Sequence, residues 1–113
     1  MDDNAVRLAG RISAEPRLRT LPSGDELCVC RIAVPRSQVR ALPSGRRAPS
    51  VDVVDLAAWA SRPRRRMAGW HEGDQVEVEG ALRRRFYRVG DRTMSRVEVE
   101  VTGARVLRRA VSG

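Results

Sequence analysis

The chain has no lysine, a single histidine, two cysteines and few aromatic residues: two tryptophans, one tyrosine and one phenylalanine. Cys28 and Cys30 are separated by one residue, and on a strand such neighbours are too far apart and too poorly aimed for a disulfide. We expect both to pack in the core as small apolar side chains. With His71 as the lone histidine, the chain lacks ligands for a metal site, so we expect no metal and no cofactor.

Motifs for catalysis and for membrane insertion are also missing. There is no phosphate-cradling glycine loop, and no serine or cysteine with a histidine at hand, so we predict that the protein is not an enzyme. No apolar run is long enough for a transmembrane helix, and the polar start Met1-Asp2-Asp3-Asn4 is not typical of a signal peptide. We therefore expect a cytoplasmic protein with no membrane span.

Arginine is the residue that the chain has in excess. All 22 basic residues are arginines, against 14 acidic residues, and the formal net charge is +8 over 113 residues. A charge of this size favours a polyanionic partner or an acidic membrane surface. The planar guanidinium group can both pair with phosphate and stack on a base. The alternative is that GC-rich codons and solubility alone explain the composition.

Residues 75–87 (QVEVEGALRRRFY) form the most informative stretch. Val76, Val78, Gly80 and Leu82 alternate with polar side chains, which predicts a strand with one buried face. A glycine within a strand is typical of a bulge, a barrel corner or a close approach by another backbone. The stretch ends in three arginines followed by Phe86 and Tyr87, and cations beside flat rings suit a phosphate chain with stacked bases.

The remaining pattern predicts four more strands and one helix. We expect the chain to be broken at Glu15-Pro16, the helix to be capped by Ser61 and to run to Trp70, and a hairpin turn to lie at residues 89–91. Turn chemistry is reused in the two LPSG segments that begin at Leu21 and Leu42. The predicted strands are residues 4–12 (with a possible extension at 17–21), 26–35, 51–60 and 94–101 (with a possible extension through Val106 and Leu107).

In the last strand we expect Val97, Val99 and Val101 to face inward. Glu98 and Glu100 are then expected on the outer face, in cross-strand ion pairs rather than as catalytic carboxylates. Five strands with a helix between the third and the fourth predict an all-β OB-fold barrel, although small Greek-key and SH3-like barrels have similar patterns. We assign residues 1–107 to this domain and 108–113 to a basic tail that frays.

Several phrases, in order along the chain, resemble the bacterial single-stranded DNA-binding protein family. The resemblance implies an OB-fold, a homotetramer (or a dimer) formed partly through the first strand, and sequence-tolerant binding of single-stranded DNA in replication, repair or recombination at the nucleoid. The phrases are NAVRLAGRI at 4–12, EPRLR at 15–19, PSG at 22–24, CRIAV at 30–34, VVDLAAW at 53–59, GDQVEVEGALRRR at 73–85 with Tyr87, and VEV at 97–99.

The resemblance assigns base stacking to Trp59 and Tyr87, and places Arg19, Arg83 and Arg85 on the DNA path. Further expected DNA contacts come from Arg7, Arg31, Arg36 and Arg40. The alternative for Trp59 is a core or interface position, whereas Phe86 and Trp70 are expected to be structural. The remaining arginines are left open between solvent and nucleic acid: the run 62–66 on the helix, and Arg46 and Arg47, with Arg40, in a long basic loop over residues 36–50 that could be mobile without a ligand.

Some positions depart from the family pattern. Gln38 and Val53 stand where the family usually stacks an aromatic ring, and Asp55 stands where a basic residue is usual. The chain also stops at Gly113 with a basic end instead of an acidic tail that recruits partner proteins, so we expect a short form or the DNA-binding core of something longer. These departures motivate the alternative function, a specialised OB-fold module that binds RNA or serves as a primosome-like assembly subunit with weakened DNA affinity.

Overall fold

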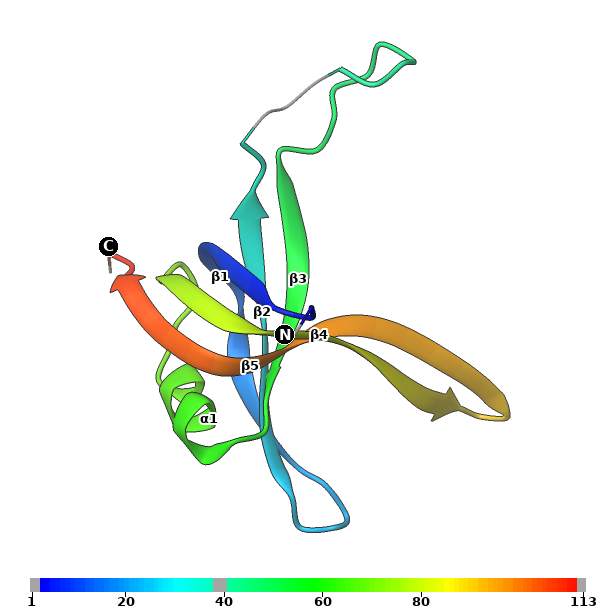
Figure 1. Ribbon diagram of the computed structural model, residues 1–113, viewed down its shortest axis with the longest axis vertical. Coiled ribbons are helices and arrows are strands. Elements are labelled where there is room, and N and C mark those ends of the chain that lie inside the picture. Colours follow the sequence, from blue (N-terminus) through cyan, green and yellow to red (C-terminus); the bar gives the residue numbers. More distant parts are fainter. Residues whose placement is uncertain (1–2, 38–40, 112–113) are drawn as a thin grey trace.

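The computed structural model describes residues 3–37 and 41–111, and it contains a closed five-stranded barrel in the order β1-β2-β3-β5-β4 (Figure 1). All strand pairs are antiparallel except β3 with β5. This arrangement confirms the predicted OB-fold, with its short helix between the third and fourth strands. The elements are β1 (Val6–Thr20), β2 (Glu26–Pro35), β3 (Val51–Ala58), α1 (Ser61–Ala68), β4 (Gln75–Val89) and β5 (Arg92–Arg108).

The core fills the barrel with aliphatic side chains from all five strands and is closed at one end by α1. Cys28 and Cys30 are both buried and free, as predicted. Trp70 is 2% exposed and packs with Met67 in the same cluster, which confirms its structural role. The helix ends at Ala68 rather than at Trp70, and its N-cap position is Ala60 without a side-chain hydrogen bond, so the predicted Ser61 cap was wrong.

β1 is one long bent strand instead of two pieces. The predicted break at Glu15-Pro16 is replaced by two shifts in the register with β2, between Ile12 and Ala14 and between Ala14 and Arg17. Such bulges bend a strand without ending it. Residues 6–11 pair with β4, and the pairing with β2 begins at Arg11, so β1 changes partner where it bends.

At Gly80 the backbone of β5 comes close to β4, which is one of the causes predicted for a glycine within a strand. A Cβ atom at this position would overlap the carbonyl oxygen of Glu100, and the register of β4 with β5 shifts between Glu79 and Gly80. Gly10 in β1 is similar, because a Cβ atom there would overlap the carbonyl oxygen of Ala33. Both glycines let strands cross closely at the corners of the barrel.

Beyond Gly80, β4 and β5 leave the barrel together as a long projecting hairpin (Figure 1). Leu82 and Val97 were predicted to be buried but are 49% and 47% exposed, because the core ends at Val99. Phe86 was predicted to be structural but is 69% exposed, since neither face of a projecting ribbon covers a core. Glu98 was predicted to face solvent but is 3% exposed.

The two LPSG segments fold in the same way. In each, the glycine N–H donates to the leucine carbonyl oxygen at 2.8 Å, and the leucine N–H donates to the carbonyl oxygen four residues later. Gly24 and Gly45 have φ values of 91° and 85°, which suit glycine. The second copy lies in the loop between β2 and β3, which projects far from the barrel (Figure 1). The structure does not test the predicted mobility of this loop, and Gln38 and Arg40 lie outside the described residues.

The start of the predicted tail is attached rather than frayed. Arg109 and the backbone N–H of Ala110 both donate to the carboxylate of Asp74, at 2.9 and 2.8 Å. β3 ends at Ala58, one residue before Trp59, and the hairpin turn falls at Gly90 and Asp91 as predicted. Within the described ranges, no helix has the length and apolar character needed to cross a membrane.

Candidate nucleic-acid interface

A groove of about 340 Å³ lies where β1, β2, β3 and β5 meet at the base of the hairpin. Arginines outnumber carboxylates along its walls, so the groove attracts anions. Its floor includes Cys30, where burial raises the pKa to about 12 and keeps the thiol protonated at neutral pH. The charged lining consists of Arg17, Arg19, Arg31 and Arg96 with Glu15, Asp55 and Glu98.

Trp59 directly follows β3 and is half-buried. The guanidinium carbon of Arg85 lies 5.2 Å from the centre of its ring, which is cation–π distance. The backbone carbonyl oxygen of Trp59 accepts a hydrogen bond of 2.9 Å from Arg64 in α1. Its indole N–H is buried, and no hydrogen-bond partner for it lies within the part of the chain that is described. The ring is thus half-buried next to the end of β3, with an arginine over it.

Tyr87 projects from the hairpin on the same face of β4 as Arg83 and Arg85. The tyrosine is 44% exposed, and the guanidinium carbon of Arg96 lies 6.0 Å from its ring centre. Phe86 lies on the opposite face of the hairpin. The two rings assigned to base stacking, Trp59 and Tyr87, therefore each have one arginine beside them. The Phe86 ring faces the other side of the hairpin.

Carboxylates of β5 hold the arginines of β4 in place. Arg85 Nε donates to Glu98 Oε1 at 2.6 Å and lies near Glu100 at 3.6 Å, while Arg83 Nε lies 3.2 Å from Glu100. These are the predicted cross-strand ion pairs. Glu98 is also 4.0 Å from Arg96. The prediction from sequence missed this central position for Glu98, because alternation alone put the residue on an outer face.

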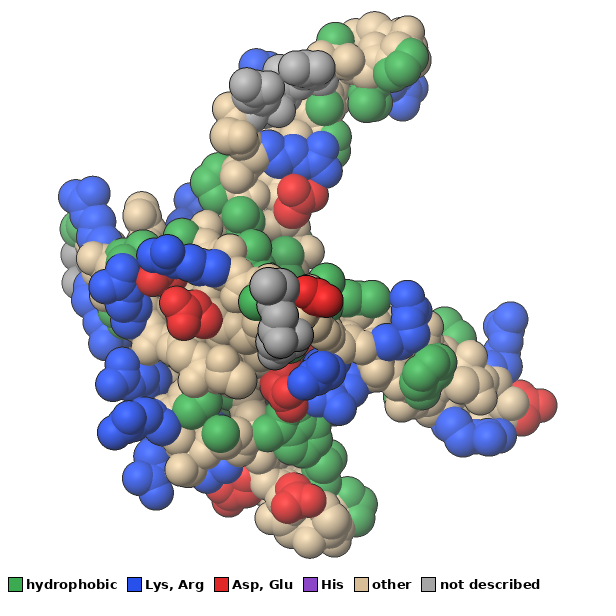
Figure 2. Space-filling view, viewed as in Figure 1, with side chains coloured by type: hydrophobic (Ala, Val, Ile, Leu, Met, Phe, Trp, Pro, Cys, Tyr) green, Lys and Arg blue, Asp and Glu red, His purple; other side chains and the backbone are tan. Residues whose placement is uncertain are grey.

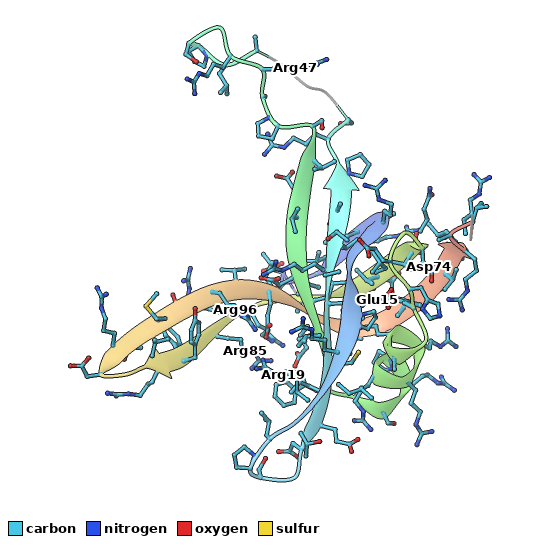
Figure 3. All side chains as sticks on the ribbon, turned by 180° about the vertical axis from the view of Figure 1, so that it is seen from behind. Glu15, Arg19, Arg47, Asp74, Arg85 and Arg96 are labelled. Carbon is cyan, nitrogen blue, oxygen red and sulfur yellow. The ribbon has the colours of Figure 1, made fainter. Side chains whose placement is uncertain are left out.

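The predicted DNA-contacting residues separate into two groups. Arg19 and Arg31 line the groove together with Arg96, and Arg85 is paired with Glu98 of the lining. Figure 3 shows Arg19, Arg85 and Arg96 near one another where the hairpin leaves the barrel. Arg31 is paired with Asp55 at 2.9 Å, so the unusual carboxylate is neutralised. Arg83 and Arg7 line a second hollow of about 480 Å³ beside Asn4 and Glu100.

Other predicted contacts lie away from the groove. Arg7 pairs with Glu77 at 2.9 Å, and Arg36 at the end of β2 pairs with Asp52 at 2.7 Å. The hydrogen bond from Arg36 lowers the pKa of Asp52 below its ordinary value. Arg47 lies at the far end of the β2–β3 loop (Figure 3), and Arg40 is outside the described residues. Figure 2 shows further arginines along the side that carries α1 and the end of β5.

Comparisons with known proteins show the family and support the fold. The sequence model of the family described as "Single-strand binding protein family" matches residues 3–108. The chain is 27% identical over 112 residues to the single-stranded DNA-binding protein of Treponema pallidum (strain Nichols), covering 99% of this chain and 62% of that protein. The structure titled "Plasmodium falciparum SSB complex with ssDNA" matches with a TM-score of 0.76 at 17% identity, covering 95% of this chain and 97% of that one.

Proposed function

Because the chain belongs to the single-strand binding protein family, we propose that it binds single-stranded DNA with little regard to sequence and protects it during replication, repair or recombination. The observation that carries the proposal is that Trp59 and Tyr87 each lie beside an arginine that is connected to the groove. Arg96, over Tyr87, lines the groove, and Arg85, over Trp59, is paired with Glu98 of its lining. Every base has a flat face that can stack on an aromatic ring, so stacking tolerates any sequence. This activity requires no catalysis, metal or cofactor.

In the proposed mechanism, arginines of the groove neutralise phosphates while the two rings hold bases. Arg19 and Arg31, with Arg17 and Arg96, supply the positive charge at the groove. Neutralising phosphates releases counterions, so affinity falls as salt rises. Arg83 beside Glu100 and Arg7 beside Glu77 would extend the path along the second hollow.

Weakened DNA affinity, the alternative that we considered, is supported by β3. Val53 is 60% exposed and offers no ring where the family usually stacks one. Part of the arginine charge is also neutralised internally, as in the Arg31–Asp55 pair. An RNA-binding role would appear as preference for poly-U over poly-dT in competition, and clear preference for poly-dT contradicts it. An assembly role that has lost useful DNA affinity would appear as unchanged affinity in the Trp59→Ala, Tyr87→Ala double variant.

We also propose that the protein is a homo-oligomer, a tetramer or a dimer, that works at the nucleoid in the cytoplasm. Supporting this, residues 6–9 of β1 pair with β4 along one edge, and among the residues described here no strand pairs with their other edge. An open strand edge is a ready site for a strand of a second copy.

The proposed function is tested by titrating the intrinsic fluorescence with an oligo-dT of roughly 35 nucleotides, with a duplex as control. Strong quenching by the single strand and little by the duplex is expected. Each of Trp59→Ala and Tyr87→Ala should weaken binding by about 1–3 kcal/mol, the usual contribution of one stacked base. Phe86→Ala, the neighbouring ring on the other face of the hairpin, is the matched control and should bind like the wild type. Unchanged affinity of the Trp59→Ala, Tyr87→Ala double variant contradicts stacking.

A further inference from the structure

We propose that Glu98 is a positioning residue that keeps Arg85 and Arg96 over Trp59 and Tyr87 in the free protein, so that a single strand must exchange its bases for these cations. The inference rests on the proposed function and adds a residue that regulates which ligands bind. Its consequence is selectivity: Glu98 discriminates against polyanions that carry phosphates but offer no unstacked bases.

The geometry of Glu98 supports this role. It is 3% exposed and lines the groove, yet it belongs to the hairpin that carries both arginines. Its Oε1 accepts a hydrogen bond of 2.6 Å from Arg85 Nε, and its Oε2 lies 4.0 Å from Arg96 Nη2. One buried carboxylate therefore faces the two cations that lie over the two stacking rings. The other charged groups around it are Arg17, Arg19, Arg31, Glu15 and Asp55 of the groove wall, and Glu100 beside Arg85.

The cations and a bound strand compete for the same places. The guanidinium carbons lie 5.2 Å from the Trp59 ring centre and 6.0 Å from the Tyr87 ring centre. A base that stacks on the face of either ring that the arginine covers needs the space that the arginine side chain now occupies. Arg85 and Arg96 must then turn toward the phosphates of the incoming strand, where charge-assisted pairs are available.

The exchange has a cost that only one kind of ligand offsets. Removing both arginines leaves the Glu98 carboxylate buried without its cations, which is unfavourable. A single strand compensates with stacked bases and phosphate contacts together. A duplex or a polyphosphate supplies phosphates but no unstacked base, so it compensates only in part. Selectivity of this kind matters for a chain whose net charge of +8 attracts every polyanion.

The variant that tests the inference is Glu98→Gln, which keeps the shape and removes the charge. It should free Arg85 and Arg96 for phosphate contacts with ligands that cannot displace them from Glu98 in the wild type, so the log–log salt dependence of duplex binding should steepen by about 0.9 for each freed arginine. The salt dependence of oligo-dT binding should change little, because a single strand already draws both arginines to its phosphates. Binding to duplex DNA and to inorganic polyphosphate should tighten more than binding to oligo-dT. In the free protein the Trp59 ring should lose its covering arginine, so acrylamide should quench the tryptophan fluorescence more strongly than in the wild type. The change reports on Trp59, because Trp70 is only 2% exposed and contributes little.

The matched control is Glu72→Gln, which makes the same change in charge at an exposed residue in the turn before β4 that lines neither hollow. It should leave the salt slope and the ligand ratios as in the wild type. If Glu98→Gln has the wild-type slope, quenching and selectivity, the inference is overturned, whereas the proposed function fails only if wild-type protein does not bind oligo-dT.

Glu98 is buried, so a second measurement uses the wild-type protein and does not depend on the variant folding. The Nε–H proton of Arg85, which is donated to Glu98, should give a protected guanidinium Nε–H signal in nuclear magnetic resonance spectra of the free protein. Saturating oligo-dT should shift this signal and remove its protection, whereas polyphosphate should not. A signal that stays unchanged with bound oligo-dT overturns the exchange.

Discussion

At the scale of single residues, Asp74 links the segment after β5 to the turn before β4. Its buried carboxylate accepts hydrogen bonds from the backbone N–H groups of His71 and Ala110 and from the guanidinium of Arg109. Burial raises the pKa of Asp74, but these hydrogen bonds and the charge of Arg109 lower it more, so the pKa lies below its ordinary value. The ionised carboxylate therefore fastens the end of β5 to the turn before β4.

This lowered pKa makes stability depend on acid. A carboxyl group with a depressed folded-state pKa contributes stability at pH values above the unfolded-state pKa of about 3.9, and the contribution is lost as the pH falls through the folded-state value. Asp74→Asn should lower the free energy of unfolding at pH 7 by about 1–3 kcal/mol, and it should flatten the loss of stability below about pH 4. Urea denaturation followed by circular dichroism across pH measures both. An unaltered acid profile in the variant would mean that other carboxylates dominate.

The sequence predicted some residues of the site and missed others for a definite reason. Trp59 and Tyr87 are predicted stacking residues because of their places in the phrases that resemble the family. Phe86 was misplaced because alternation assumes one buried face, and the hairpin has none beyond Gly80. Glu98 was missed for the complementary reason, since its burial depends on β1, β2 and β3 closing over the groove, which is a contact between distant parts of the chain.

At the scale of elements, β4 depends on the absence of a side chain at Gly80. A Cβ atom there would meet the backbone of β5, which cannot move aside as a flexible side chain could. Sequence reasoning could name a bulge, a corner or a close approach as the cause, and the structure shows both a bulge and a close approach. The LPSG turns were equally predictable, because proline and glycine fix their backbone locally.

Gly80→Ala should therefore be strongly destabilising, by about 2–4 kcal/mol, because two strands would have to separate. Gly103→Ala is the matched control in the partner strand, since its Cβ atom would lie 3.6 Å from the nearest atom of Glu79, at ordinary contact distance. This control should change the free energy of unfolding by less than about 1 kcal/mol. Chemical denaturation of the two variants side by side provides the measurement, and equal losses would contradict the backbone-clash explanation.

At the scale of the whole molecule, order and type of elements followed from the sequence, whereas the path of the bent β1 did not. The bulges of β1 bend the strand so that the barrel can close, and no local sequence pattern indicates where that bend must lie. The open edge at residues 6–9 is a property of the same closure, because β1 has passed from β4 to β2 beyond the bend. That edge is where we expect a second copy to add.

Light scattering should accordingly give a mass that is a multiple of the monomer mass, four-fold for a tetramer. The backbone amides of residues 6–9 should be protected from hydrogen exchange in the assembly and lose that protection when dilution yields monomers. A monomer at all concentrations would contradict the proposed assembly. An oligomer whose edge amides exchange freely would place the contact on another surface.

The parallel junction of β3 with β5 is the shortest seam of the barrel, with only Leu56 opposite Val99 and Ala57 opposite Glu100. Every other neighbouring pair is held over a longer ladder. We therefore expect β3 and β5 to separate transiently before any other pair of strands in the barrel does. Trp59 follows β3 directly, while Arg85 is bound to β5 through Glu98. A transient separation of β3 from β5 would move the Trp59 ring away from Arg85. The same fluctuation that loosens the fold would then uncover the ring for the proposed stacking of a base.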